Sequence, residues 1–202
     1  MNKERYMNTY LSKLITFDLK TGLAGKKDAE SLKRPLSRLK DIFSDRSATT
    51  ALLEKGDPLV YEFYDMGIPE KAGEIAFGTS IVYPGTVGRE FYMTKGHFHT
   101  ILDTAEVYLC LRGHGMMMME SPEGKVEYRE LRPGQAVYVP GRYAHRSINL
   151  SKDEQLVTFF AFAADAGHDY GTIEVQGFRK LVLATDDGYE VVDNPNWKGS
   201  GR

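Results

Sequence analysis

Short apolar runs that alternate with turn residues characterise the chain from residue 59 onward. The runs are rich in β-branched and aromatic residues, and turns such as Pro84-Gly85 and Pro133-Gly134 separate them. They predict strands at Leu59–Tyr64, Ile75–Tyr83, Glu106–Leu111, Met116–Glu120, Val126–Leu131, Gln135–Val139, Arg146–Leu150, Leu156–Phe162, Phe178–Leu183 and Tyr189–Val192. Many short strands at near-even spacing predict an all-β fold of the jelly-roll type.

The first part of the chain has a different texture. Residues 1–45 have an irregular pattern with charge clusters, such as Lys26-Lys27-Asp28, so we expect an irregular N-terminal arm. Ser44-Asp45 precedes a helical stretch through Glu54 that Gly56 and Pro58 end, and this pattern predicts a short capped helix. We therefore predict an arm over residues 1–45 and a single barrel domain over residues 46–202.

Charge, hydropathy and cysteine content limit the classes of binding partner and the cellular compartment that the sequence favours. The formal net charge of −2 gives no basic surface that would predict a nucleic-acid partner. No apolar run reaches the length of a membrane span, and no apolar signal core follows Met1. The single cysteine, Cys110, cannot form an internal disulfide, which is compatible with a reducing compartment. The sequence thus predicts a cytoplasmic protein with no membrane partner.

Three histidines and one glutamate carry the candidate chemistry. His97 and His99 stand at i and i+2, a spacing that on a strand projects both imidazoles from one face. Glu106 and His145 each lie in a strand-like segment of their own, which makes a chance pair of histidines the weaker interpretation. Imidazole and carboxylate together suit a first-row divalent ion such as Fe, Mn, Ni or Zn.

The segments around these ligands resemble the two cupin motifs. The first motif is matched by His97-Phe98-His99, Glu106 and Gly113, and the second by Gly134, Pro140, His145 and Asn149. A narrower resemblance, from about Asp57 to Trp197, is to the cupin-type glucose-6-phosphate isomerases best known from archaea. It is carried by Tyr83–Phe91, Thr94–His99, Ala105–Tyr108, Ala164–Ile173 and Val192-Asp193-Asn194-Pro195.

The resemblance implies a cupin double-stranded β-helix, a jelly-roll barrel, that forms a homodimer. It implies an enzyme that interconverts glucose 6-phosphate and fructose 6-phosphate in glycolysis and gluconeogenesis. One divalent metal per subunit, with iron expected and Mn, Ni or Zn as alternatives, would be bound by His97, His99, Glu106 and His145. The metal would polarise the C1 and C2 oxygens. Glu106 would assist hydrogen transfer, and both an enediol route and a hydride shift stay open.

Further site residues follow from position on the strands and from the same resemblance. Tyr108 shares the face of Glu106 at i+2 and is expected to orient its carboxylate or a sugar oxygen. His168 is expected to donate to the phosphate or to the ring-opening oxygens. Purely structural roles for these two residues stay open. The phosphate group is expected to contact Thr79, Ser80, Thr94, Gly96 and Tyr170.

Three other functions stay open at this point. An iron-dependent cupin dioxygenase could use the same ligands to bind a substrate enolate and O₂. A non-catalytic sugar-phosphate-binding cupin could keep the metal as a structural ion. An isomerase acting on mannose 6-phosphate, alone or in addition, would be chemically close. Turnover without O₂ and turnover of mannose 6-phosphate would discriminate among them.

Overall fold

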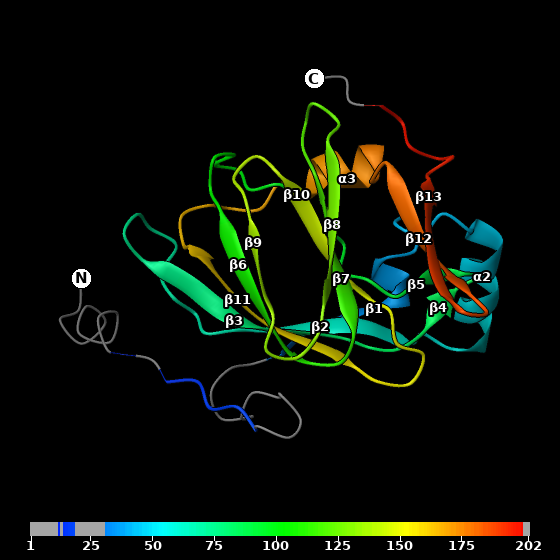
Figure 1. Cartoon of the computed structure of the whole chain (residues 1–202), viewed down its shortest axis with the longest axis horizontal. Coiled ribbons are helices and arrows are strands. Elements are labelled where there is room, and N and C mark those ends of the chain that lie inside the picture. Colours follow the sequence, from blue (N-terminus) through cyan, green and yellow to red (C-terminus); the bar gives the residue numbers. More distant parts are fainter. Residues whose placement is uncertain (1–11, 13, 19–30, 200–202) are drawn as a thin grey trace.

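Two β-sheets enclose the core of the molecule in a computed structural model that describes residues 12, 14–18 and 31–199 (Figure 1). Within these residues the larger sheet has the strand order β1 (Ser31–Pro35), β2 (Leu59–Asp65), β3 (Ile75–Val82), β11 (Leu156–Ala163), β6 (Glu106–Arg112) and β9 (Ala136–Val139). The smaller sheet has the order β10 (Ala144–Asn149), β7 (Gly115–Glu120) and β8 (Val126–Leu131). Their facing side chains fill the barrel with apolar residues.

A third sheet lies beside the barrel, on the right in Figure 1. Its order among the described residues is β13 (Gly188–Asp193), β12 (Lys180–Thr185), β5 (Glu90–Phe91) and β4 (Thr86–Val87). It covers the outer face of the smaller barrel sheet, because the Glu120 carboxylate of β7 accepts a hydrogen bond from the backbone N–H of Arg179, next to β12, at 2.7 Å. All four methionines of β7 are consequently buried.

The prediction of an all-β jelly-roll barrel is confirmed. Each strand expected from the apolar runs is present, with ends that differ by two residues or fewer. The short strands β1, β4 and β5, the 3₁₀ helix η1 (Leu36–Arg38) and the helix α3 (Tyr170–Gln176) were not expected from the sequence pattern. No helix in the described part of the chain is long and apolar enough to cross a bilayer.

The segment before residue 46 contributes to the barrel. Strand β1 extends the larger sheet by pairing antiparallel with β2, and Leu36 and Leu39 are buried in the core. The division between arm and domain at residue 45 stays a prediction. The expected helix is present as α2 (Arg46–Lys55), and the Asp45 carboxylate accepts a hydrogen bond from the backbone N–H of Ala48 at 2.8 Å.

The pairing register decides which side chains enter the barrel. Tyr108 of β6 lies opposite Phe160 of β11, which lies opposite Gly78 of β3, and these residues share the inner face. Ser80 is two residues from Gly78 on the same strand, so it also faces inward, whereas Thr79 faces the outside of the sheet.

Replacing the capping residue of α2 tests the local energetics of this element. Asp45→Ala removes the side chain that satisfies an otherwise unpaired N–H in the first turn. We expect the free energy of unfolding to fall by about 1 kcal/mol. Urea denaturation of the variant and of wild type would measure this, with Asp45→Asn as a control that keeps a capping oxygen. An unchanged midpoint for Asp45→Ala would contradict the capping role.

Candidate metal centre

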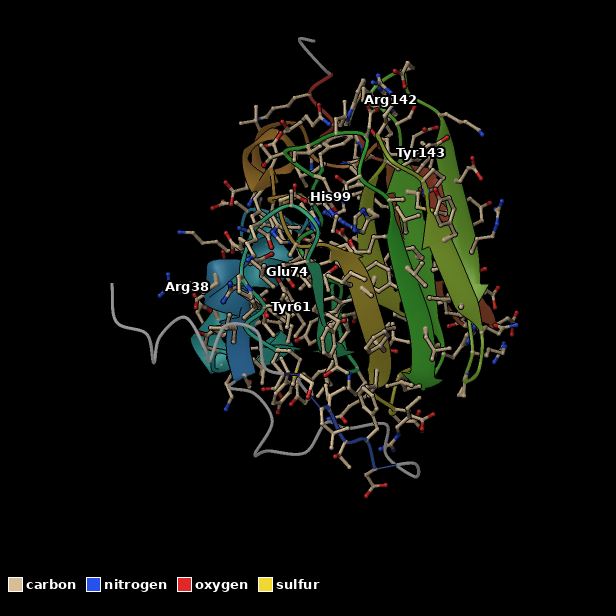
Figure 2. All side chains as sticks on the ribbon, turned by 90° about the vertical axis from the view of Figure 1, so that its left-hand side faces the viewer. Arg38, Tyr61, Glu74, His99, Arg142 and Tyr143 are labelled. Atoms are coloured by element: carbon tan, nitrogen blue, oxygen red, sulfur yellow. The ribbon has the colours of Figure 1, made fainter. Side chains whose placement is uncertain are left out.

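Four potential ligand side chains converge inside one end of the barrel. His97 and His99 come from an extended segment that follows β5, Glu106 begins β6, and His145 lies in β10. One ligand atom from each residue lies within 4.8 Å of the others, and all four side chains are buried. Figure 2 looks at this end of the molecule, where His99 and Tyr143 are labelled near each other.

Backbone pairing places the histidine pair. His97 forms an antiparallel bridge with His145, with hydrogen bonds from His97 N–H to the His145 carbonyl (3.3 Å) and from His145 N–H to the His97 carbonyl (3.1 Å). Further along, the Thr94 N–H donates to the Ser147 carbonyl at 2.9 Å. Backbone hydrogen bonds therefore hold the segment that carries His97 and His99 against β10, which carries His145.

The hydrogen bonds of the imidazole rings favour metal binding. The Nδ1 atoms of His99 and His145 lie 3.0 and 3.2 Å from the carbonyl oxygens of Thr104 and Tyr143, respectively. A carbonyl can only accept, so each Nδ1 carries a proton, and in the neutral form of either ring the lone pair is on Nε2, where a metal would bind. These Nε2 atoms lie 3.2 and 2.9 Å from Oε2 of Glu106. A ring nitrogen and a carboxylate oxygen at such distances have a positive charge between them, which is either a proton on Nε2 or a bound cation.

The third histidine supports the same conclusion. Burial, followed by the neighbouring rings of His145, His168 and His99, lowers the pKa of His97 well below its usual range, so the ring is neutral. Its Nε2 is buried and has no hydrogen-bond partner among the described residues. An unpartnered buried lone pair is costly. A divalent cation bound by these four residues would satisfy this atom, so the donor set fits a metal.

The ionisation of Glu106 also suits a ligand. Burial alone would raise the pKa of this carboxyl, but the charges and hydrogen bonds of His145 and His99 outweigh burial and lower its pKa to about 2. Tyr108 shows the opposite shift, because burial and then the charge and hydrogen bond of Glu106 raise its pKa well above the usual value. Tyr108 therefore keeps its proton and can donate it in a hydrogen bond to the carboxylate.

Two more of the expected residues border the four ligands. The His168 ring lies 4.5 Å from the His97 ring, centroid to centroid, and stacks on Tyr170 at 5.6 Å with an interplanar angle of 9°. Burial lowers the pKa of His168. Phe162 stacks on His99 at 5.4 Å. The structure thus brings Tyr108, His168 and Tyr170 to the ligand cluster.

Three residues expected to contact the phosphate group, Thr94, Gly96 and Ser80, lie in the segment before the histidines or on the inner face of the larger sheet. Thr94 lies against β10, where its hydroxyl accepts from the Ser147 N–H at 3.0 Å. Gly96 has φ +80°, and a Cβ there would lie 3.1 Å from the His145 carbonyl oxygen and 2.7 Å from the Phe178 ring, so only glycine fits. The Ser80 hydroxyl faces inward and hydrogen-bonds with that of Thr158 at 2.8 Å.

Thr79 is separated from the other candidates. Its side chain lies on the outer face of the sheet, beside Phe159 in the neighbouring strand, because successive strand residues point to opposite faces. The structure does not bring Thr79 to the ligand cluster.

Sequence reasoning did not single out two residues of this region, Arg34 and Tyr61. They are directly opposite each other on β1 and β2. Tyr61 is buried, and its hydroxyl interacts with the backbone of Lys95, inside the segment that carries the histidines. No motif marks either residue, so only the strand pairing reveals them.

The family model described as "Glucose-6-phosphate isomerase (GPI)" matches residues 33–198. The chain belongs to the glucose-6-phosphate isomerase family. It is 45% identical over 184 residues to the glucose-6-phosphate isomerase of Pyrococcus furiosus, covering 91% of this chain and 96% of that protein. It is 46% identical to that of Thermococcus kodakarensis, covering 91% and 95%. The isomerase resemblance inferred from the motifs is confirmed.

Two solved structures match about half of the chain. An oxalate oxidase has a TM-score of 0.46 at 12% identity and covers 56% of each chain. An oxalate decarboxylase has a TM-score of 0.41 at 24% identity, covering 52% of this chain and 26% of that one.

Removal of one ligand tests the metal centre directly. We expect wild type to bind one divalent ion per chain and His97→Ala to bind it more than about 100-fold more weakly, since loss of only a supporting hydrogen bond already costs about 10- to 100-fold. Elemental analysis and metal titration would measure this. His114→Ala is the matched control, because His114 lies in a turn and contacts Glu130 instead of the cluster. Equal metal content in all three proteins would exclude the proposed site.

Proposed function

We propose that this chain interconverts glucose 6-phosphate and fructose 6-phosphate in a metal-dependent reaction. The observation that carries the proposal is the buried group of His97, His99, Glu106 and His145 in a chain of the glucose-6-phosphate isomerase family. An aldose–ketose isomerase moves hydrogen between C1 and C2, so it needs a group that handles a proton and a means of stabilising charge on two neighbouring oxygens. A divalent metal held by these ligands would polarise those oxygens as a Lewis acid.

Glu106 is the proposed group for hydrogen transfer. Its carboxyl is ionised, because its pKa is lowered to about 2 against the effect of burial. An ionised carboxylate can accept the proton from C2 and return it to C1 through an enediol. Tyr108, which keeps its proton, would hold the carboxylate in one orientation. His168, whose imidazole ring lies beside that of His97, would donate a hydrogen bond to a sugar oxygen while the sugar ring opens.

The phosphate end of the substrate is proposed to lie along Ser80, Thr94, Gly96 and Tyr170. Hydroxyl and backbone N–H donors suit a phosphate oxygen, and Gly96 leaves the backbone open for close approach. Lys95 lies at the edge of this region, where its ammonium sits 5.2 Å above the Tyr170 ring and pairs with Glu174 at 2.5 Å.

Iron is the proposed metal, and Mn, Ni and Zn are alternatives. Three imidazoles and one carboxylate are compatible with each of these ions, and no soft thiolate ligand joins the described cluster. We also propose a cytoplasmic location, which is supported by a single cysteine, Cys110, that is buried and unpaired.

We further propose that the protein is a homodimer. The outer face of the larger sheet exposes Val107 (41%) and Tyr138 (64%), which lie directly opposite each other on β6 and β9. β9 is an edge strand of that sheet. An exposed apolar pair beside a strand edge favours contact with a second copy of the chain.

An anaerobic conversion assay tests the reaction. Chelator-treated protein would receive Fe, Mn, Ni or Zn and then fructose 6-phosphate in the absence of O₂. We expect glucose 6-phosphate to form with at least one metal, and His145→Ala to lose at least 99% of the rate because it lacks a ligand, a loss of about 3 kcal/mol in transition-state stabilisation.

His114→Ala serves again as the histidine control and should keep its activity. Absence of turnover by folded wild type with every metal would sink the isomerase proposal. Oxygen uptake with a substrate enolate would then be measured, since it would indicate the dioxygenase alternative. Mannose 6-phosphate would be assayed beside fructose 6-phosphate to test the breadth of the reaction.

Substitution on the exposed sheet face tests the dimer. We expect wild type to have twice the chain mass of 22.8 kDa and Tyr138→Lys to shift toward the single-chain mass, because a buried unpaired ammonium disfavours association. Light scattering after size-exclusion chromatography would measure both. Tyr128→Lys is the matched control, because Tyr128 is an exposed tyrosine (45%) on the other barrel sheet. A monomeric wild type, or the same shift in both variants, would refute this interface.

A further inference from the structure

An arginine from the segment before the barrel domain shares the inner face of the larger sheet. Arg34 of β1 lies directly opposite Tyr61 of β2, and residues opposite each other in an antiparallel pair project to the same side. Phe63, two residues from Tyr61, lies opposite Ser80. Since Ser80 faces the barrel interior, the register places Arg34, Tyr61 and Ser80 on the same side of the sheet.

Tyr61 connects Arg34 to the substrate region. Burial raises the pKa of Tyr61, and the charge and a hydrogen bond of Arg34 partly offset this rise, as does a hydrogen bond from the backbone of Lys95. The pKa of Tyr170 is raised to about 12, first by burial and then by the charge of Tyr61. The positive charge of Arg34 opposes this rise. Arg34 therefore lies beside Tyr61, on the same side of the sheet, and Tyr61 in turn contacts the backbone of Lys95, between Thr94 and Gly96.

Arg34 is a cation whose charge is not neutralised by the described residues. None of their carboxylates forms an ion pair with it, and its guanidinium lies 5.3 Å from the centre of the Phe63 ring and donates to the Lys33 carbonyl at 3.2 Å. Lys95, a second cation at this end, is paired with Glu174. Arg146 is also near, but it donates to the Lys95 carbonyl from the opposite face of β10.

A cation at this position, unpaired among the described residues, suits a phosphate group. The hydroxyls of Ser80 and Thr94 and the N–H of Gly96 offer hydrogen bonds but no charge, whereas a guanidinium binds two phosphate oxygens at once through its planar fork. We infer that Arg34 binds the phosphate group of the substrate, so that β1 completes the substrate site. This inference rests on the proposed isomerase function, and it makes part of the predicted N-terminal arm a component of the site.

Kinetics with Arg34→Met test the inference. We expect the KM for fructose 6-phosphate to rise about tenfold or more, as for loss of a hydrogen bond to a charged group. We expect kcat to change less than threefold, since Arg34 touches the phosphate and not C1 or C2. Arg34→Lys keeps the charge and loses the fork, so its KM should lie between those of wild type and Arg34→Met.

Arg38→Met is the matched control. Arg38 lies four residues further along the same segment, on η1, and is exposed. Figure 2 shows it projecting from the surface away from Tyr61. This variant should have wild-type KM and kcat. An unchanged KM in Arg34→Met, or an equal rise in Arg38→Met, would overturn the inference.

Calorimetric titration with inorganic phosphate separates this inference from the isomerase proposal. Metal-loaded wild type should bind phosphate, and Arg34→Met should bind it about tenfold more weakly or worse. This result would support Arg34 even if no metal gave turnover, in which case only the isomerase proposal would fail. Equal phosphate affinity in both proteins would overturn the role of Arg34. If Arg34→Met does not fold, wild-type KM and phosphate affinity in Arg34→Lys would overturn it instead.

Discussion

The site depends on the crowding of four electron-rich ligand atoms in a buried space. When the rings are neutral, such an arrangement is unfavourable without a cation, because the Nε2 lone pairs and the Glu106 oxygens would repel each other in a medium of low dielectric. Only a backbone that cannot relax will hold them together. The reciprocal hydrogen bonds between His97 and His145 supply that constraint, because they fix the two rings 4.5 Å apart before any ion binds.

The constraint is reinforced from outside the barrel. Arg146 follows His145 on β10, so its side chain points to the opposite face, under the third sheet. There its guanidinium donates to the Lys95 carbonyl at 2.6 Å and lies 4.0 Å from the centre of the Phe178 ring. The same ring closes the space above Gly96. Phe178, just before β12, thus packs against both Arg146 and the ligand-bearing segment at Gly96, so the chain that enters the third sheet contributes to the geometry of the site.

Much of the fold was predictable because its strands are long enough to show their pattern. β3 and β11 span eight residues each and are bounded by clear turns. The missed elements lacked such a signal. β4 and β5 have two residues each, and β1 contains Lys33, Arg34 and Pro35, residues that disfavour a strand when read alone. The helix α3 contains Gly171 and three β-branched residues, so only its cap, Asp169, signalled it.

In the candidate site, the metal ligands were predictable from the sequence and several residues of the substrate region were not. The ligands could be found because each is a histidine or a glutamate at the spacing of a known motif. Residue type and spacing can both be read directly from the sequence. Thr79 and Ser80 show the limit, since neighbouring strand residues cannot both face the barrel, and alternation alone would have required a choice between them. Arg34 and Tyr61 lie 27 positions apart (61 − 34) and become neighbours only through the β1–β2 register. A contact created by strand pairing leaves no mark on either residue, so the residues proposed here to bind the charged end of the substrate emerge only from the fold.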